Sequence, residues 1–199
     1  MNYQRLYDHM APFYASAMRL LPMWTRYTQQ ALPCLPQAGA ILEIGPGPGV
    51  LLAQIVQARR QVVAADLSLQ MLRRAQHRLR QSNLPAHFTQ ANVMHLPFIA
   101  GTFDGIVLTF VFSAIPNGAA AMCEMQRVLR PNGVLVLIDA CLPGDNNRIA
   151  RGLGRLWTLF GDSLRDEAAL MQAGGLDAIE RHEFGAFHSI RLTAGRKHG

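Results

Sequence analysis

Two kinds of apolar pattern alternate along the chain. Nearly continuous apolar runs of strand length lie at AILEI (40–44), QVVAAD (61–66) and VLVLIDA (134–140). Between them, segments such as VLLAQIVQAR (50–59) and GAAAMCEMQRVLR (118–130) show the spacing of helices. Strands that are apolar throughout are typical of parallel sheets covered on both faces. The alternation therefore predicts an α/β fold built on a mostly parallel sheet.

Weaker signals fill the gaps in this pattern. AHFTQAN (86–92) predicts a short third strand, and GTFDGIVLTFVF (101–112) predicts a turn followed by a fourth strand. Ser68 precedes the helical run at 69–81, and its hydroxyl can accept a hydrogen bond from the free amides of the first turn. A turn at residues 131–133, Pro-Asn-Gly, is expected to stop the helix before the fifth strand.

The two ends of the chain depart from the alternation. After a helix at Leu164–Ala173, the segments 176–184 and 187–197 alternate apolar and polar residues, which predicts an antiparallel hairpin at the sheet edge. Residues 1–38 have a helical pattern that prolines interrupt. We therefore expect seven strands in a single domain spanning residues 1–199, with residues 1–38 as a helical cover.

The composition is that of a folded globular protein, with half of the residues apolar and 16% charged. No apolar run reaches membrane-spanning length, and the N-terminal residues lack the pattern of a secretory signal. Cys34, Cys123 and Cys141 are far apart and form no CxxC pair. These features predict a reduced, cytoplasmic chain without a metal site.

The formal net charge is +6, with arginines concentrated at Arg73–Arg80 and Arg148–Arg155. Such a charge could indicate a polyanionic partner, but a slightly basic, solvated surface is the preferred interpretation. No zinc finger, RNP-type motif or long Lys/Arg run is present. The sequence therefore does not favour a nucleic acid as partner.

The stretch ILEIGPGPGV (41–50) carries the clearest chemical signal. A glycine-rich loop after the first strand lies where open α/β sheets bind ligands. The dinucleotide pattern needs a third small residue where Val50 stands, and Pro46 and Pro48 lack the N–H groups that bind a diphosphate. Asp66 ends the second strand, where a carboxylate can accept hydrogen bonds from a ribose. The loop thus favours an adenosine-containing ligand without a diphosphate.

Several motifs occur in an order that resembles the class I S-adenosylmethionine-dependent methyltransferases. EIGPGPG matches the E/DxGxGxG loop of that family, VVAADLSLQML its second acidic motif, and QANVMHLPF its adenine-side loop. FDGIVLTFVF and EMQRVLRPNGVLVLIDA match the blocks of the fourth and fifth strands. The N-terminal YDHMAPFY and the C-terminal LTAG are similar to the ubiquinone/menaquinone C-methyltransferases and bacterial phospholipid N-methyltransferases. The resemblance implies a Rossmann-like three-layer sandwich, seven strands, and S-adenosylmethionine as cofactor, with S-adenosylhomocysteine as product.

The resemblance also implies a cofactor site at matching positions. The glycine loop would line the methionine part of the cofactor, the acidic residues would orient the loop and hold the ribose, and the two tyrosines would close the site from the N-terminal side. The implied residues are Tyr7, Tyr14, Glu43, Gly45, Pro46, Gly47, Gly49, Asp66, Leu67, Met71, Asn92, Val93 and Thr109. Some have simpler explanations: Met71 as helix core, Glu43 as a loop cap, and the tyrosines as one apolar helical face.

The sequence indicates the site of the methyl acceptor less clearly than the cofactor site. His9, His95, Thr109 and Ser113 are the candidate catalytic residues, because their segments are expected to border the acceptor side. The quinone C-methyltransferases carry an arginine in a GxRNV pattern at the place of Ser113, whereas this chain reads FVFSAIP. That difference argues against quinone C-methylation as the specific reaction.

A variable insert is expected at residues 141–162. Its residues 148–160 combine an apolar helical face with an arginine-bearing face. The segment is interpreted either as a helix that covers the acceptor pocket or as a peripheral contact with an anionic membrane surface on the cytoplasmic side. The second interpretation suits a lipid acceptor.

Three functions follow as hypotheses. The first is in-line methyl transfer from S-adenosylmethionine to a small or lipidic acceptor, either an amine, a thiol, a hydroxyl or an activated carbon. The second is a non-catalytic module that binds S-adenosylmethionine. The third is a nucleic-acid methyltransferase, although Thr109-Phe110-Val111-Phe112 stands in place of the N/D-P-P-Y/F motif of many such enzymes. The sequence does not indicate the oligomeric state.

Overall fold

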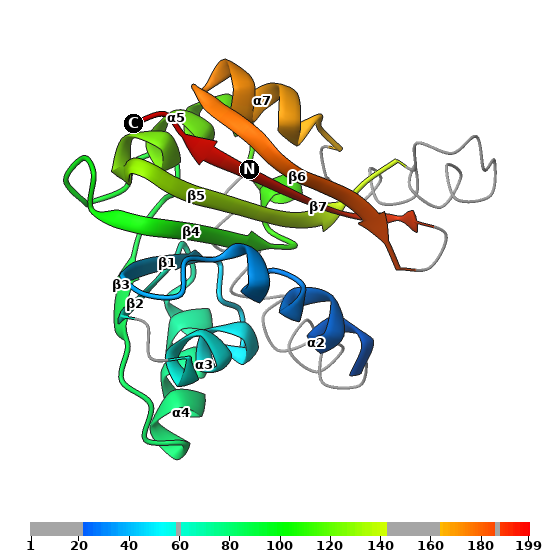
Figure 1. Ribbon diagram of the computed structural model, residues 1–199. Helices are drawn as coiled ribbons and strands as arrows, with labels where there is room; N and C mark the ends of the chain where they lie inside the picture. The colour runs from blue at the N-terminus through cyan, green and yellow to red at the C-terminus, as the bar shows by residue number, and fades with distance from the viewer. Residues whose placement is uncertain (1–21, 59–60, 143–163, 186–187) are drawn as a thin grey trace.

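A seven-stranded sheet forms the centre of the computed structural model, which describes residues 22–58, 61–142, 164–185 and 188–199 (Figure 1). The strand order is β3-β2-β1-β4-β5-β7-β6. Strands β1 to β5 pair in parallel, and β7 pairs antiparallel with both β5 and β6. The strands are β1 (Ala40–Ile44), β2 (Gln61–Asp66), β3 (His87–Gln90), β4 (Phe103–Thr109), β5 (Leu129–Ala140), β6 (Leu176–Phe184) and β7 (Ile190–Lys197). The predicted fold class is confirmed.

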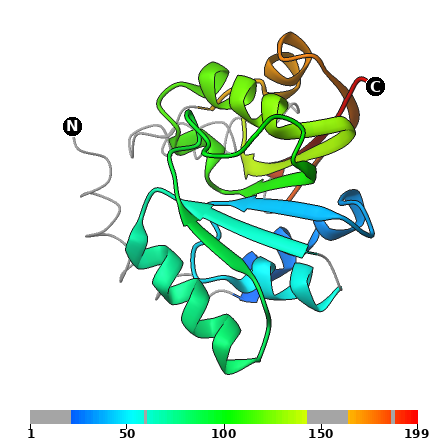
Figure 2. The ribbon, with the colours of Figure 1, turned by 90° about the vertical axis from the view of Figure 1, so that its left-hand side faces the viewer.

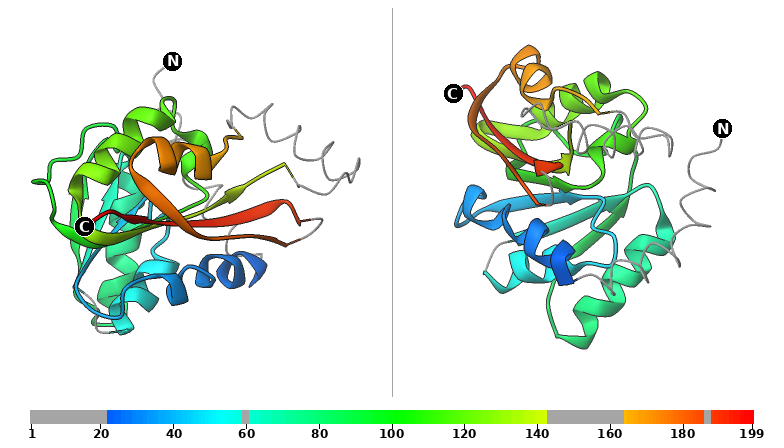
Figure 3. Two further views of the ribbon diagram at one scale, coloured as in Figure 1. Left: turned by 45° about the horizontal axis from the view of Figure 1, so that its top comes forward. Right: turned by 90° about the vertical axis from the view of Figure 1, so that its right-hand side faces the viewer.

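Helices cover the sheet on both faces, which makes three layers (Figures 2 and 3). One buried cluster joins the sheet to α3 and α4, and residues next to α2 extend it. The other joins the opposite face to α5 and α7. The helices are α2 (Pro22–Gln29), α3 (Val50–Gln57), α4 (Leu69–Gln81), α5 (Gly118–Val128) and α7 (Glu167–Ala173), with short 3-10 turns η1 (Leu32–Cys34) and η2 (Phe112–Ala114). This layering explains the apolar strands, because neither face of the central strands meets solvent.

Three of the described helices have an N-cap residue whose side chain accepts a hydrogen bond from a first-turn amide. The Ser68 hydroxyl accepts a hydrogen bond from the amide of Met71, as predicted. Asn117 and Asp166 accept equivalent bonds at the starts of α5 and α7. Because Asp166 is the N-cap, α7 begins at Glu167, three residues later than the apolar pattern predicted.

The predicted turn at residues 131–133 lies within β5. Phe103 pairs with Leu129 but Gly105 pairs with Val134, so the register shifts and the Pro-Asn-Gly residues form a bulged portion of the strand. Asn132 there has a φ of 64°. The preceding helix correspondingly ends at Val128 rather than Arg130. The sequence correctly predicted an irregular backbone at residues 131–133, but these residues belong to the strand and do not separate it from the helix.

Several sequence predictions fall outside the described residues. These are Tyr7, His9 and Tyr14, most of the predicted N-terminal cover, and residues 148–160 of the variable insert. The single-domain organisation over residues 1–199 stays a prediction. Among the described helices, none has the length and apolar character needed to cross a bilayer.

Candidate functional site

The carboxyl ends of β1, β2 and β4 converge around the glycine loop. The amide of Gly45 donates to the carbonyl of Ala65 at 2.8 Å, which ties the loop to β2. On its other side Gly45 packs so closely on Val111, just after β4, that a Cβ at this position would overlap the valine side chain. The segments that follow three parallel strands therefore meet at one edge of the sheet, where such sheets bind ligands.

The three glycines of the loop have different surroundings. Gly45, Gly47 and Gly49 have φ values of 67°, 52° and 75°, a region that other residues adopt only under strain. A Cβ on Gly49 would lie 2.9 Å from Cα of Ala75 in α4, whereas a Cβ on Gly47 would have no atom of the described residues within 4 Å. Gly49 therefore allows close helix packing, and Gly47 presents bare backbone to open space. A ligand can approach the backbone closely at Gly47.

Glu43 is the buried acid beneath this loop. Its side chain is 2% exposed, and Oε2 has no hydrogen-bond partner among the described residues. Burial, and to a smaller extent the nearby Asp66 carboxylate, raise the pKa of this carboxyl to about 8. An unpartnered acid at the carboxyl end of β1 is suited to meet a polar or positively charged ligand group.

Asp66 ends β2 in a different environment. It is only partly buried, and its Oδ1 accepts a hydrogen bond of 2.9 Å from the amide of Ser68. Its carbonyl accepts the amide of Ala91 at 2.9 Å, which brings the segment after β3 alongside. Asn92 and Val93 of that segment are partly buried, and the Asn92 side chain accepts the amide of Met94. The predicted ribose and adenine positions thus lie together at one end of the sheet.

Leu67 and Met71 continue from Asp66 into α4. Leu67 is partly buried, and Met71 is buried at 6% exposure in the first turn of the helix. Met71 belongs to neither of the two large apolar clusters, although it is buried. The cofactor assignment of both residues remains a prediction.

The segment after β4 forms the other side of the site. Thr109 is partly buried at the end of the strand, and Phe110 follows with a φ of 56°, an unusual value for a residue with a side chain. The amide of Phe110 donates to Ile138 of β5 at 2.7 Å, which holds this conformation. The ring of Trp24 from α2 meets the Phe110 ring edge-on, with centroids 4.3 Å apart. Sequence reasoning missed Trp24 as a site residue, because its segment is far from β4 along the chain.

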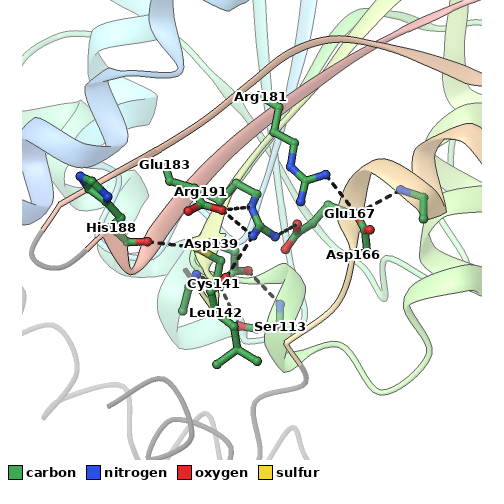
Figure 4. A network of polar contacts seen from close by, with 12 residues as sticks. Ser113, Asp139, Cys141, Leu142, Asp166, Glu167, Arg181, Glu183, His188 and Arg191 are labelled. Carbon is green, nitrogen blue, oxygen red and sulfur yellow. Dashed lines mark hydrogen bonds and ion pairs between the residues drawn. The ribbon is translucent and has the colours of Figure 1, made fainter. Parts of the chain in front are cut away.

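Ser113 is fixed by a buried aspartate. Asp139, near the end of β5, accepts the Ser113 amide at 2.8 Å and the Ser113 hydroxyl at 2.9 Å (Figure 4). Burial raises the pKa of Asp139 to about 6 even though these hydrogen bonds favour the ionised form. Arg165 also donates hydrogen bonds to the carbonyls of Phe112 and Ile115. The segment after β4 is therefore held at several points.

A second buried network lies beside Asp139. Arg191 of β7 pairs with Glu183 of β6 at 2.7 Å and with Glu167 of α7 at 3.3 Å, and it donates to the carbonyl of Leu142 at 3.2 Å (Figure 4). The sequence analysis missed these residues. The sequence does mark Asp139, because an acid follows the apolar run VLVLI (134–138), as Asp66 follows QVVAA.

His95 lies on the outer side of the segment after β3. It is exposed, and its backbone pairs with Asn92. In the neighbouring α5, the hydrogen bond from Arg127 lowers the pKa of the Glu124 carboxyl, which also accepts the amide of Leu96. The described residues contain no group of three or more His, Cys, Asp or Glu side chains placed to hold a metal ion.

A surface hollow lies at the opposite edge of the sheet from the glycine loop. It is lined by residues 33–38 before β1, by Asp104 at the start of β4, and by Arg196 of β7. Its position at the amino ends of the parallel strands separates it from the converging loops described above.

Comparison with known proteins identifies the domain. The family profile described as "Methyltransferase domain" matches residues 42–137. The demethylmenaquinone methyltransferase of Lactiplantibacillus plantarum is 30% identical over 152 residues, which cover 71% of this chain and 64% of that protein. The ubiquinone/menaquinone biosynthesis C-methyltransferase UbiE of Syntrophotalea carbinolica is 32% identical over 160 residues, covering 77% and 66%. Residues 42–137 of this chain are therefore a methyltransferase domain, of the class I S-adenosylmethionine-dependent kind.

Solved structures with low sequence identity to this methyltransferase share its fold. The [4+2]-cyclase SpnF superposes with a TM-score of 0.78 at 14% identity, covering 98% of this chain and 95% of that one. A geranyl diphosphate methyltransferase in complex with GPP and sinefungin superposes with a TM-score of 0.71 at 14% identity, covering 86% and 76%. The alignments with the two curated relatives span just under two thirds of the length of those relatives.

S-adenosylmethionine is the cofactor of this class, and the described residues of the methyltransferase fit it. Gly47 leaves bare backbone for close approach, and Asp66 offers a partly exposed carboxylate at the end of the neighbouring strand. Glu43 adds a buried carboxyl oxygen without a partner on the side of the loop. The cofactor carries positive charge and a ribose but no phosphate, which matches this donor and acceptor set.

Proposed function

We propose that this protein transfers a methyl group from S-adenosylmethionine to a small or lipidic acceptor. The observation that carries the proposal is the close contact of Gly45 with Val111. That contact places the loop expected to hold the cofactor directly against the segment after β4. A methyl donor on the loop and an acceptor beyond Thr109 would then lie side by side, as in-line displacement requires.

The protein residues would act by binding, orienting and excluding water. The bound cofactor supplies an activated methyl group on a sulfonium. Asp66 would accept hydrogen bonds from the ribose hydroxyls, and the backbone at Gly47 would lie along the methionine portion. Trp24 and Phe110 would keep water from the acceptor side, because their rings pack edge-on at its border.

A hydroquinone ring carbon is the first acceptor to test. The two curated relatives described above are named for methylation in quinone biosynthesis. Against this choice, Ser113 stands where the quinone C-methyltransferase pattern GxRNV has an arginine, and its hydroxyl donates a hydrogen bond to Asp139. If the ring is the acceptor, its hydroxyl proton must leave by another group, and Thr109 is the partly buried candidate on the same segment.

The test is turnover of cofactor labelled in the methyl group. Purified protein is incubated with a reduced, short-chain demethylmenaquinol, with a phospholipid amine, and with fractionated cell extract. Label in an organic-soluble product supports the proposal and identifies the acceptor. Tight binding of the cofactor without transfer across all three arms contradicts it.

A cofactor-binding protein without methyl transfer is the second candidate. The observation in its favour is the fold of a [4+2]-cyclase, which matches almost the whole chain at a TM-score of 0.78. The architecture therefore does not require methyl transfer. The same labelled-cofactor experiment separates the two candidates, because only the first consumes cofactor.

Contact with an anionic membrane through residues 148–160 and a cytoplasmic location remain proposals. They rest on the basic amphipathic pattern of that segment in the sequence. Co-sedimentation with vesicles containing an anionic phospholipid tests the contact. Binding that high salt abolishes is expected, whereas binding to neutral vesicles of equal strength contradicts the electrostatic contact.

A further inference from the structure

The acid beneath the glycine loop is isolated from charge-compensating partners in the described structure. Glu43 is the fourth residue of β1, opposite Ala64 of β2 and Val107 of β4, and both of those neighbours are fully buried apolar residues. Oε2 of Glu43 accepts no hydrogen bond from the residues that the structure describes. An ionised carboxylate in such a place, without a cation or donor, would be strongly destabilised.

The charges around Glu43 make ionisation harder still. On β2 the acting group is the Asp66 carboxylate, and a like charge favours the neutral acid. On α3 the buried side chains are Leu51, Leu52, Ile55 and Val56, which carry no charge. On β4 the buried run from Ile106 to Leu108 is apolar. No described element packed against Glu43 offers it a cation.

We propose that Glu43 is a neutral acid in the free protein and ionises when the cofactor binds, becoming the counter-ion of a positive charge on the methionine portion. The inference rests on the proposed cofactor site. Its new content is the proton: the carboxyl hydrogen leaves to solvent, and the carboxylate that remains is compensated by the ligand cation. The burial that disfavours the lone charge then strengthens the ion pair.

S-adenosylmethionine has two positive groups in reach of this role, the sulfonium and the amino group. The product S-adenosylhomocysteine keeps the amino group and lacks the sulfonium charge. 5′-Methylthioadenosine keeps the adenosine and a neutral sulfur but has neither cation. The three ligands together therefore distinguish which positive charge takes the Glu43 carboxylate as its partner.

Calorimetric titration in buffers of different ionisation enthalpy counts the protons released on binding. With a pKa of about 8 in the free protein, about 0.9 proton is expected at pH 7, and the affinity rises close to tenfold between pH 6 and pH 7. Release with both amino-bearing ligands assigns the charge to the amino group. Release with S-adenosylmethionine alone assigns it to the sulfonium. Methylthioadenosine is expected to bind without release.

Glu43→Gln is the matched control, because the amide keeps the shape of the side chain and cannot ionise. The ligand amino group titrates in the same range, and its contribution remains in this variant. The proton count attributable to Glu43 is therefore the difference between the two proteins. Equal counts in wild type and variant would overturn the proposal, as would binding by the wild type with no proton release.

The free protein provides an independent measurement. Carbon-13 labelling of glutamate carboxyls, with Glu43→Gln used to assign the resonance, gives the titration of Glu43 without any ligand. A midpoint near pH 8 supports the proposal, and a midpoint in the ordinary glutamate range overturns it. If no adenosyl ligand binds at all, the proposed function fails, and this titration still reports whether Glu43 is neutral.

Discussion

At the scale of single residues, two acids at adjacent strand ends have been given different properties by their surroundings. Asp66 is partly exposed, and its carboxylate accepts a hydrogen bond from the amide of Ser68, which stabilises the ionised form. Glu43 is buried, and no described residue donates a hydrogen bond to its Oε2, so its ionised form lacks this stabilisation. The sequence alone marks both as acidic positions near a glycine loop. Burial and hydrogen bonding decide which of them is ionised.

Asp66→Ala is expected to weaken cofactor affinity by at least about 100-fold. On the proposed ribose assignment, the substitution removes two charge-assisted hydrogen bonds, and each such bond contributes about 1.5–3 kcal/mol. Calorimetry with S-adenosylhomocysteine measures the change, and circular dichroism checks that the fold persists. Asp66→Asn, which keeps one acceptor oxygen, is expected to lose less. Unchanged affinity in the alanine variant would remove the ribose assignment.

Glu43 is also expected to make stability fall as pH rises. Its folded pKa of about 8 lies above the ordinary value of 4.5, so the folded state holds a proton that the unfolded state releases between those values. The contribution of this group to stability is therefore complete below about pH 4.5 and is lost as pH rises through about 8.

Glu43→Gln tests this prediction by urea unfolding at pH 5 and pH 9 without ligand. The free energy of unfolding of the variant is expected to rise relative to that of the wild type between pH 5 and pH 9. The relative change is about 4 kcal/mol at most, since each pKa unit corresponds to about 1.4 kcal/mol. Parallel pH dependence in the two proteins would show that Glu43 is ionised in the free protein.

At the scale of elements, the glycine loop both turns the chain and sets the distance between helices. Gly49 is in contact with Ala75 of α4, and Gly45 with Val111 after β4. Gly47 lies between them, and a Cβ there would contact none of the described residues. The loop is thus packed at its two ends and open in the middle, which is the arrangement a ligand needs.

Gly49→Ala and Gly47→Ala form a matched pair. Both place a side chain at positive φ, which costs about 1–2 kcal/mol. Only Gly49→Ala also drives a Cβ into the backbone of α4, so its loss of stability is expected to be about 1–3 kcal/mol larger. Urea unfolding measures both. Equal losses would contradict the close packing of α3 and α4 across Gly49.

At the scale of the whole molecule, a buried ion cluster joins the antiparallel end of the sheet to its helical layer. Arg191 links β7 to Glu183 of β6 and to Glu167 of α7, and its side chain is only 9% exposed (Figure 4). Burial raises the pKa of Glu167 against the lowering effect of Arg191. Without the arginine, two carboxylates would remain near one another with little solvent.

Arg191→Met is expected to destabilise the protein by about 3–5 kcal/mol, because removal of one partner leaves buried charge without compensation. Arg130→Met is the control. It breaks the Arg130–Asp104 pair, in which the arginine side chain is 50% exposed, and a loss of less than about 1 kcal/mol is expected. Thermal unfolding at neutral pH compares them. Similar losses in the two variants would show that the Arg191 cluster is as weak as a surface pair.

The sequence by itself determined the order and kind of most elements, because apolar periodicity reflects burial on one or both faces of an element. It also determined the glycine loop, the Ser68 cap and the exclusion of a diphosphate, since these depend on local backbone chemistry at Pro46, Pro48 and Val50. The hairpin of β6 and β7 was predicted on the same grounds and is confirmed.

Only the tertiary structure decided which residues from distant parts of the sequence are in contact. It placed β7 between β5 and β6, and so brought Arg191 beside Asp139 and Glu167. It set Trp24 of α2 against Phe110, and it left Glu43 buried without a donor. Such contacts join residues far apart along the chain. The charge state of a buried acid depends on all of its neighbours at once, and no local pattern contains that information.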